Sequence, residues 1–464
     1  MFDAAHLALA YLLLEWAIRI CMIVVIPLRR PPEAARSWLL LVMFLPLPAL
    51  LLYRMIGRAR FPRWRHQRFL TSAPLRDHVA GAMPLPTSAP SQLSQLVQRL
   101  GGFPACAGNS LAFQTHYADI VAAMVEAIDG AVRSVHLQTY IFADDHTGTL
   151  FIDALGRAVA RGVDVRVLVD ALGSRPWSKR SMAKLRGAGV DARLTLPIGF
   201  LLRRLRRDLR NHRKLCLIDG CTGFIGSLNI VDRDFKGGIV NDELVARVDG
   251  PVVAALEATF LTDWHLESAQ LLDHPIIPPA SGALVLQPMP SSPDHPSLGY
   301  ERLLVEAIHA AKDEVTIVTP YLIPDDALMV ALKNAVDRGV SVHIIVSMVV
   351  DQYLVRLAQR SFYDELLHAG VHLFRYRDRL LHAKSVSVDG RIGLVGSSNA
   401  DIRSFMLNAE ISLLIHDPAA TQALEQIHCG YRHASDILTL AEWRSRPRLM
   451  RPLENLARLL TPLL

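Results

Sequence analysis

Two stretches decide the fold: "NHRKLCLIDG", from Asn211 to Gly220, and "LHAKSVSVDG", from Leu381 to Gly390. Each holds a His, a Lys two residues later, and an Asp-Gly pair that begins seven residues after the His. A His and a Lys two residues apart point to the same face of a β-strand. An Asp-Gly pair is typical of a tight hairpin turn. We therefore predict a hairpin in each stretch, with His and Lys side by side on its first strand.

The surroundings of the two stretches repeat as well. "GSLN" follows the first stretch and "GSSN" the second, so Asn229 and Asn399 are separated by 170 residues, as are His212 and His382. A Glu follows each Asn at a similar distance. Strand, helix and strand patterns precede both stretches, which is typical of βαβ units and a largely parallel sheet. The chain is therefore expected to be an α/β protein built by internal duplication.

Four parts are predicted along the 464 residues. Residues 1–70 form a hydrophobic hairpin that anchors the protein in a membrane, and residues 71–273 form the first lobe. Residues 274–298 are rich in Pro and Ser and are expected to be a linker. Residues 299–464 form the second lobe and end in an amphipathic tail.

The N-terminal part contains two apolar runs, Leu7–Leu28 and Ser37–Tyr53, and prolines interrupt the second. The first run, as a helix, would be about 33 Å long, enough to cross a bilayer. A cleaved signal peptide is the alternative, but the stretch before the run is acidic and no small-residue cleavage site follows. Three arginines lie between the runs and six follow the second, which favours a two-pass hairpin with a cytoplasmic body.

The repeated residues suit a phosphodiester substrate. Two lysines and two asparagines can neutralise and hydrogen-bond its non-bridging oxygens. One neutral imidazole can attack phosphorus, while the other, protonated, donates to the leaving oxygen. Each imidazole needs a partner on its other nitrogen, and Glu243 and Glu410 are the candidates. Asp219 and Asp389 fall on the opposite face at the turn, and we interpret them as turn-forming or supporting residues rather than bases.

Other interpretations of the histidines are weaker. A single buried His is often structural, but the same pattern at matching spacing in both halves argues against this. A metal site is disfavoured because a Lys beside each His repels a cation, and the five cysteines lack ligand spacing. Neither a metal nor a cofactor is expected. The net charge of +6 suits an anionic partner without identifying it.

The motifs resemble those of the phospholipase D superfamily, which carries a doubled His-x-Lys-x4-Asp followed by Gly-Ser-x-Asn. Within it, the chain is similar to the bacterial cardiolipin synthases over essentially its whole length. The resemblance is carried by "RNHRKLCLIDG", by "GSSNADIRSFMLNAE" and by the tail "WRSRPRLMRPLENLARLLTPLL". It implies two α/β lobes related by a pseudo-twofold axis, with the site in the cleft between them.

The resemblance also implies a reaction. A phosphatidyl group would be transferred without a metal through a covalent phosphatidyl-histidine, with His212 as nucleophile and His382 as acid and then base. The usual reaction joins two phosphatidylglycerols into cardiolipin and releases glycerol. A phospholipase D-type lipid hydrolase or another phosphatidyltransferase would use the same residues. A nuclease is disfavoured by the apolar runs and by the lack of a long basic stripe with interleaved aromatics, and a non-catalytic scaffold by the intact motifs.

The expected setting is a bacterial inner membrane, with anionic phosphatidylglycerol as the partner and no nucleic acid. The Arg-rich segment Leu201–Arg213 can meet anionic headgroups, and a solvated loop is its alternative. The tail can be a core helix, a membrane-surface helix or a contact in a homodimer.

The candidate site residues share their place in the duplicated pattern. They are His212, Lys214, Asp219, His382, Lys384 and Asp389 as the catalytic motifs, Asn229, Asn399, Ser227 and Ser397 as substrate-binding residues, and Glu243 and Glu410 as supporting residues.

Overall fold

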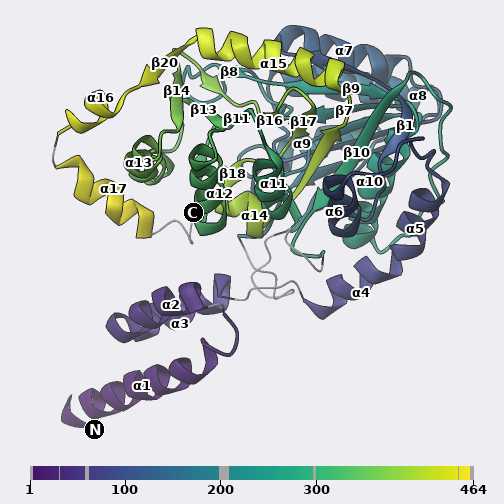
Figure 1. Cartoon of the computed structure of the whole chain (residues 1–464). Coiled ribbons are helices and arrows are strands. Elements are labelled where there is room, and N and C mark those ends of the chain that lie inside the picture. Colours follow the sequence, from purple (N-terminus) through teal and green to yellow (C-terminus); the bar gives the residue numbers. More distant parts are fainter. Residues whose placement is uncertain are drawn as a thin grey trace. The chain divides into compact units, whose positions relative to one another are not determined.

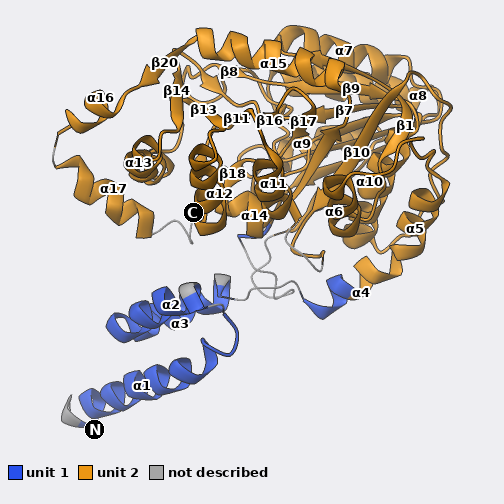
Figure 2. Cartoon of the chain, in the orientation of Figure 1, with its two compact units in different colours: residues 1–66, 198–209 blue, residues 67–197, 210–464 orange. Residues whose placement is uncertain are grey.

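The computed structural model describes residues 4–30, 32–57, 62–197, 208–295, 299–447 and 449–459. The chain divides into two compact units, which Figure 2 colours separately. The first unit consists of Met1–His66 and Ile198–Leu209, and the second of Gln67–Pro197 and Arg210–Leu464. Both copies of the motif therefore lie in the second unit.

The first unit contains three apolar helices, α1 (Ala4–Val25), α2 (Pro32–Phe44) and α3 (Pro46–Ile56). Among the described residues, one helical stretch, His6–Val25, is long and apolar enough to cross a membrane. The second apolar run is divided because Pro46 begins a new helix. With 13 residues, α2 is about 20 Å long, less than the ~30 Å hydrocarbon core of a bilayer. The unit thus has the composition of a membrane-associated segment, and α1 contains its one described stretch that is long enough to span a membrane.

The strands of the second unit fall into two similar series. The first series is β1 (Cys106–Gln114), β2 (Ser134–Thr139), β3 (Asp164–Asp170), β4 (Asp191–Thr195), β5 (Arg210–Asn211), β6 (Leu215–Ile218), β7 (Thr222–Gly226), β8 (Asn241–Asp242) and β9 (Val245–Asp249). The second series is β10 (Leu284–Ser291), β11 (Glu314–Val318), β12 (Leu322–Ile323), β13 (Ser341–Ser347), β14 (His372–Tyr376), β15 (Leu380–Leu381), β16 (Ser385–Val388), β17 (Ile392–Gly396), β18 (Ala400–Asp401), β19 (Asn408–Ile415) and β20 (Ser435–Leu438).

The helices follow the same division. Before the linker region lie α4 (Arg63–Thr71), α5 (Ala73–Ala82), α6 (Gln92–Gly101), α7 (Tyr117–Asp129), α8 (His146–Ala160), α9 (Ser178–Gly187) and α10 (Val252–Ser268). After it lie α11 (Gly299–Ala310), α12 (Asp326–Asp337), α13 (Tyr353–His368), α14 (Ile402–Met406), α15 (Pro418–His433), α16 (Leu440–Arg444) and α17 (Met450–Leu459).

One sheet of 16 strands runs through both lobes (Figure 1). Its order in the first lobe is β4-β3-β2-β6-β7-β9-β1, and the second lobe repeats it in mirror order as β10-β19-β17-β16-β11-β13-β14. In each lobe three consecutive strands are parallel, β2, β3 and β4 in the first and β11, β13 and β14 in the second, and the first strand of the motif hairpin is antiparallel to them. In the second lobe β20 adds an antiparallel strand beyond β14, and β5 pairs with β19 beside the main order. The prediction of two similar mixed α/β lobes is therefore confirmed, with the two sheets joined through β1 and β10.

Each lobe has helices on both faces of its sheet, as the alternation along β6 shows in the first lobe. Leu215 and Leu217 pack with residues of α10 in one apolar cluster. Cys216 and Ile218 pack with α7 and α8 in another. Because successive strand residues point to opposite faces, the all-apolar "LCLI" is explained by burial on both sides.

The second lobe uses polar contacts on one of its two faces. Val386 and Val388 of β16 pack in the cluster that contains α11, α12 and α13. On the other face, Ser385 and Ser387 hydrogen-bond both ring nitrogens of His428 in α15, at 2.8 and 3.1 Å. The two lobes therefore share a topology but not a core sequence.

The segment 274–298, expected to be a linker from its composition, contains the central strand β10. This strand pairs antiparallel with β1 and with β19. Its pairing with β1 extends only to Leu286, so Pro288 and Pro290 lie where one side of the strand has no ladder to interrupt. The prolines that suggested a linker are thus compatible with a strand.

The C-terminal tail forms α17, which packs against α13. Glu454 is 1 % exposed and accepts hydrogen bonds from Arg360 and Arg446 at 2.8 and 3.2 Å. The leucines on the other side of the helix, including Leu453 and Leu456, are exposed. One face of the predicted amphipathic tail is therefore tied to the second lobe.

Candidate active site

Short strands bring each motif to the other half of the molecule. β5, just before His212, pairs with β19 of the second lobe, and β15, just before His382, pairs with β8 of the first. The backbone N–H of His212 donates to the Ala409 carbonyl, and that of His382 to the Asp242 carbonyl, both at 2.8 Å. The two histidines are thus held by strands of opposite lobes.

The histidines and glutamates form crossed pairs. Nδ1 of His212 lies 3.0 Å from the Glu410 carboxylate, and Nδ1 of His382 lies 2.9 Å from that of Glu243. The sequence predicted that these glutamates support the histidines but did not say which supports which. Since an ionised carboxylate only accepts, Nδ1 carries the hydrogen in each ring and Nε2 keeps a free lone pair.

The Glu410 carboxylate is held by three more donors. Ser397 Oγ donates at 2.5 Å, Ser404 Oγ at 2.9 Å and Asn408 Nδ2 at 3.1 Å. In the first half, Ser227 Oγ hydrogen-bonds the backbone of Leu244. Against the effect of burial, the pKa of Glu243 is lowered chiefly by His382, then by Lys384 and to a smaller extent by Ser227. The two serines, expected to bind substrate, are fully buried behind the glutamates instead.

The two lysines lie in the same buried region. Lys214 Nζ donates to the His212 carbonyl at 2.8 Å, and Lys384 Nζ donates to the His382 carbonyl. Burial lowers the pKa of Lys214 to about 7 and that of Lys384 to about 8, against the attraction of the two glutamates. Both amines are therefore poised to gain stabilisation from an anion.

Burial also lowers the pKa of the histidines. The pKa of His212 falls to about 4, because burial and the positive charges of Lys214 and Lys384 outweigh the effect of Glu410. The pKa of His382 is lowered by burial and by the same two lysines, against Glu243. Since each lysine influences the imidazole of the other half, the two motifs form one electrostatic site. Both imidazoles are favoured as neutral bases in the free protein.

Asp219 and Asp389 lie away from this region, at the opposite ends of β6 and β16 from the lysines. Both have positive φ, 54° and 53°, and each is followed by a Gly with positive φ, as a tight hairpin turn requires. The Asp219 carboxylate accepts from the backbone N–H groups of residues 132–134 at 2.7 to 3.2 Å. Asp389 does the same for residues 312–314 at 2.8 to 2.9 Å. The predicted hairpins are confirmed, and these carboxylates tie each turn to the start of a parallel strand.

Replacing Asp219 with Ala is expected to lower the free energy of unfolding by about 1–3 kcal/mol, because three backbone N–H groups lose their acceptor. The turnover of the folded fraction should fall far less than in Lys214→Ala. Denaturant unfolding and activity per folded molecule check this, with Asp219→Asn as the milder variant that still tolerates positive φ. A loss of turnover equal to that of Lys214→Ala at unchanged stability would contradict the structural role.

The two asparagines differ in their contacts. Asn229 Oδ1 accepts the backbone N–H of Ile141 at 3.2 Å. Asn399 Nδ2 donates to Asp401 Oδ2 at 3.0 Å. One of the two amide hydrogens of Asn399, which were expected to bind phosphate, is therefore directed at a carboxylate in this structure.

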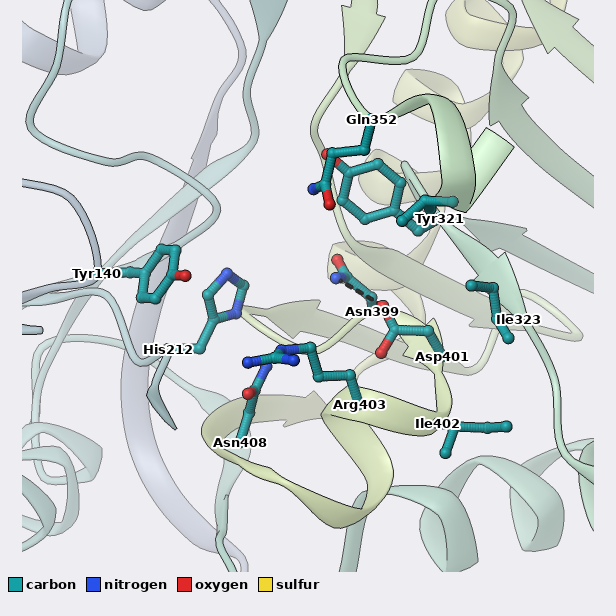
Figure 3. A pocket seen from close by; sticks show the side chains of 11 residues that line it. Tyr140, His212, Tyr321, Ile323, Gln352, Asn399, Asp401, Ile402, Arg403 and Asn408 are labelled. Atoms are coloured by element: carbon teal, nitrogen blue, oxygen red, sulfur yellow. Dashed lines mark hydrogen bonds between the residues drawn. The ribbon is translucent and has the colours of Figure 1, made fainter. Parts of the chain in front are cut away.

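A pocket of about 190 Å³ lies against His212 (Figure 3). It is lined by Tyr140, His212, Tyr321, Ile323, Gln352, Val355, Asn399, Asp401, Ile402, Arg403 and Asn408. Sequence reasoning gave no role to Tyr140, Tyr321, Gln352, Arg403 or Asn408. The one available signal was "RSFMLNAE", which contains two of them and resembled the synthases without indicating a function.

Part of the predicted membrane-facing segment is interior instead. Residues 198–207 lie outside the described residues. Arg210 pairs with Asp170 at 3.5 Å and Arg213 with Asp263 at 2.5 Å, and both arginines are at most 2 % exposed. The expectation that these two arginines meet lipid headgroups is therefore wrong, since buried carboxylates already pair with them. Within the described part of the chain, no group of three His, Cys, Asp or Glu side chains could hold a metal ion.

The fold and the doubled site define a phospholipase D-like protein with two lobes. Its fold is shared with the phosphatidylserine synthase of Haemophilus influenzae Rd KW20, with a TM-score of 0.60 and 16% identity, covering 81% of this chain and 100% of that one. A family model described as "Cardiolipin synthase, PLD-like domain" matches residues 124–264 and 304–428.

Curated relatives match along nearly the whole chain. It is 34% identical over 460 residues to cardiolipin synthase A of Proteus mirabilis (strain HI4320). It is 33% identical over 462 residues to that of Yersinia pseudotuberculosis serotype O:1b (strain IP 31758). Both alignments cover 94% of each chain. The chain therefore belongs to the cardiolipin synthase family of phospholipase D-like phosphatidyltransferases, which confirms the resemblance seen in its motifs.

Proposed function

We propose that this protein is a membrane-bound cardiolipin synthase, which transfers a phosphatidyl group from one phosphatidylglycerol to another and releases glycerol. One observation carries the proposal: two buried histidines keep Nε2 free while Nδ1 is bound to a glutamate of the other lobe, beside two buried lysines. That arrangement offers one base and one acid to a single phosphodiester, with positive charge for its oxygens.

In the first step, Nε2 of His212 attacks phosphorus and forms a phosphorus–nitrogen bond. The bond from phosphorus to the oxygen of the headgroup glycerol breaks, and that oxygen takes a proton from His382. The pocket favours His212 as the nucleophile, because His212 lines it and His382 does not. Lys214 and Lys384 stabilise the charge that shifts onto the non-bridging oxygens.

In the second step, the roles reverse. His382, now neutral, accepts the proton of a hydroxyl group on the second phosphatidylglycerol as that oxygen attacks phosphorus. The phosphorus–nitrogen bond breaks and His212 is released. Although His382 is favoured as neutral in the free site, an adjacent anionic phosphodiester raises the pKa of an imidazole. Glu243 then stabilises the imidazolium.

The N-terminal unit would keep the enzyme in the bilayer that contains its substrate. The spanning length of His6–Val25 supports an anchor. We propose the two-pass hairpin and the cytoplasmic body on the distribution of arginines around the apolar runs.

Product analysis tests the proposal. The full-length protein, purified in detergent, is incubated with phosphatidylglycerol as the sole lipid. Equal amounts of cardiolipin and glycerol are expected. Phosphatidic acid as the sole lipid product would contradict the proposal and indicate a phospholipase D-type hydrolase instead. Transfer only to an added alcohol would indicate another phosphatidyltransferase.

The lysines predict how activity depends on pH. As pH rises through the lowered pKa values of about 7 and about 8, Lys214 and then Lys384 lose their protons in the free enzyme. The kcat/KM for phosphatidylglycerol is expected to fall by roughly tenfold per pH unit between about pH 7 and about pH 8, where Lys214 loses its proton, and by roughly a hundredfold per pH unit above about pH 8, where both lysines have lost theirs, chiefly through KM. Arg keeps its charge in this range, so Lys214→Arg should move the alkaline limb to higher pH even if its rate is lower. If kcat/KM of Lys214→Arg fell over the same alkaline pH range as that of the wild-type enzyme, the fall would be due to a group other than Lys214.

A further inference from the structure

The helix α17, labelled near the C-terminus in Figure 1, turns a charged side chain inward and leucines outward. Leu453, Leu456 and Leu459 follow one another at intervals of three residues, so they lie along one side of the helix, which we call the leucine stripe. They are 47 %, 58 % and 72 % exposed, whereas Glu454 is 1 % exposed. An amphipathic helix on a protein surface normally buries its apolar side. The leucine stripe therefore faces away from the unit to which the helix belongs.

Polar contacts fix this orientation. The Glu454 carboxylate accepts from Arg360 of α13 at 2.8 Å and from Arg446 at 3.2 Å. One turn later, the guanidinium carbon of Arg458 lies 4.4 Å from the ring centroid of Phe362 in α13. Rotating α17 to bury the leucines would break these contacts and leave Arg360 and Arg446 without their carboxylate, which is unfavourable. The outward direction of the leucine stripe is therefore built into the fold, and its apolar surface is available to a partner.

The charge of the tail indicates the class of that partner. Residues 443–464 include five arginines and one acidic residue, Glu454, whose charge is already paired inside the protein. Arg444 and Arg451 are exposed. Leucines on one side of a helix with arginines beside them are typical of helices that lie in the headgroup region of an anionic bilayer. Two copies of the chain meeting through the stripe would bring like charges together, which disfavours a dimer contact.

The helix that supports α17 also reaches the pocket beside His212. Gln352, which immediately precedes α13, and Val355, in the first turn of α13, line that pocket. Tyr353 and Leu354, between them in the sequence, are exposed. Exposed apolar side chains therefore lie both at the start of α13 and on the helix packed against it. A lipid surface docked on α17 would be held by the same helix that borders the pocket.

We propose that the leucine stripe docks on the surface of an anionic phospholipid bilayer and gives the second unit a membrane contact of its own, separate from α1. This inference goes beyond the proposed function, because it concerns where the lipid surface binds and holds for any reaction at the site. The leucines would lie just below the lipid headgroups, and the arginines would meet the phosphates. Such a contact forms readily on a protein that α1 already holds at the membrane, because the second of two linked contacts has a high effective concentration.

Photo-crosslinking identifies what covers the leucine stripe. Leu456 is replaced with p-benzoylphenylalanine in the full-length protein, which is reconstituted into vesicles of phosphatidylglycerol and phosphatidylcholine and irradiated. We expect a lipid adduct at position 456, found by mass mapping. The control places the same residue at Leu150, an exposed leucine of α8, and should give no lipid adduct.

The other outcomes of crosslinking would overturn the inference. A cross-link from position 456 to residues 1–66 would make the N-terminal unit of the same chain the partner. A cross-link to a second chain would make the stripe a dimer contact. The absence of any adduct at position 456 would leave the stripe without a docking role.

Substrates in two physical states test the consequence for activity. In vesicles with long-chain phosphatidylglycerol, Leu456→Glu should lower kcat/KM by roughly tenfold, mainly through KM, since a charge replaces a leucine at the bilayer. In detergent with short-chain phosphatidylglycerol dissolved as monomers, the variant should match the wild-type enzyme, because no surface has to be docked. Leu150→Glu should match the wild-type enzyme in both assays. Equal losses of Leu456→Glu in both assays, or a loss in neither, would overturn the inference.

The two proposals fail in different ways. If phosphatidylglycerol gives no cardiolipin, the proposed function is wrong, yet crosslinking at position 456 still measures docking. If cardiolipin forms but no lipid becomes attached at position 456, only the docking inference is wrong.

Discussion

Replacing His212 with Ala is expected to reduce glycerol release from phosphatidylglycerol by about 10⁴-fold or more, because the attacking nitrogen is lost. No covalent lipid should accumulate on the protein. His382→Ala should also slow turnover, but the remaining nucleophile should retain lipid on His212, since no base activates the incoming alcohol. Incubation with labelled phosphatidylglycerol, acid quenching and mass mapping of the modified histidine measure both effects.

A buried histidine outside the site provides the control. His428 is 1 % exposed and bonds Ser385 and Ser387 with its two ring nitrogens. His428→Ala should lower stability by removing a buried imidazole, yet its folded fraction should still form the covalent intermediate. Lipid found on His382 in the wild-type enzyme would reverse the assignment of nucleophile and acid.

The second large effect is expected from the glutamates. Glu410→Gln should lower kcat by about 10³–10⁴-fold, because a neutral amide neither enforces the Nδ1–H tautomer nor stabilises a charged imidazole. The structure pairs Glu410 with His212, so this variant should slow the formation of the covalent intermediate. Glu243→Gln should act on His382 and let the intermediate accumulate.

Single-turnover kinetics with labelled lipid distinguish the two steps. Glu243 precedes β9 of the first lobe and Glu410 lies within β19 of the second, so a pairing within one lobe would give the inverse pattern. Slow formation in Glu243→Gln with accumulation in Glu410→Gln would contradict the crossed arrangement. Thermal unfolding of both variants separates a loss of chemistry from a loss of fold.

Local features of the fold could be predicted from the residues. The His-x-Lys spacing and the Asp-Gly pair predicted hairpins, because strand parity and positive φ are properties of a few consecutive residues. Repetition of the pattern predicted two similar lobes. The composition of 274–298 predicted a linker, however, and the structure contains β10 there. Prolines indicate an interrupted ladder, but whether a ladder exists at those positions depends on the neighbouring strands.

The contacts of the site were less accessible to sequence reasoning. Asp219 was interpreted as a turn-forming or supporting residue, but its acceptor role toward the backbone N–H groups of residues 132–134, at the start of β2, is visible only in the structure. Ser397 was expected at the substrate, yet its hydroxyl donates to Glu410. A regular spacing places a side chain on a face of a strand but does not say what that face meets.

The sequence by itself determined the chemical groups and their number: two imidazoles, two amines and two carboxylates in a duplicated α/β framework. Only the tertiary structure decided that each imidazole is held by the carboxylate of the other lobe, and that α17 turns its leucines outward. The physical reason is how far apart along the chain the interacting residues lie. Parity, turns and repeats are encoded over a few residues, whereas Glu410 meets His212 across 198 residues, through strand pairings that no local pattern specifies.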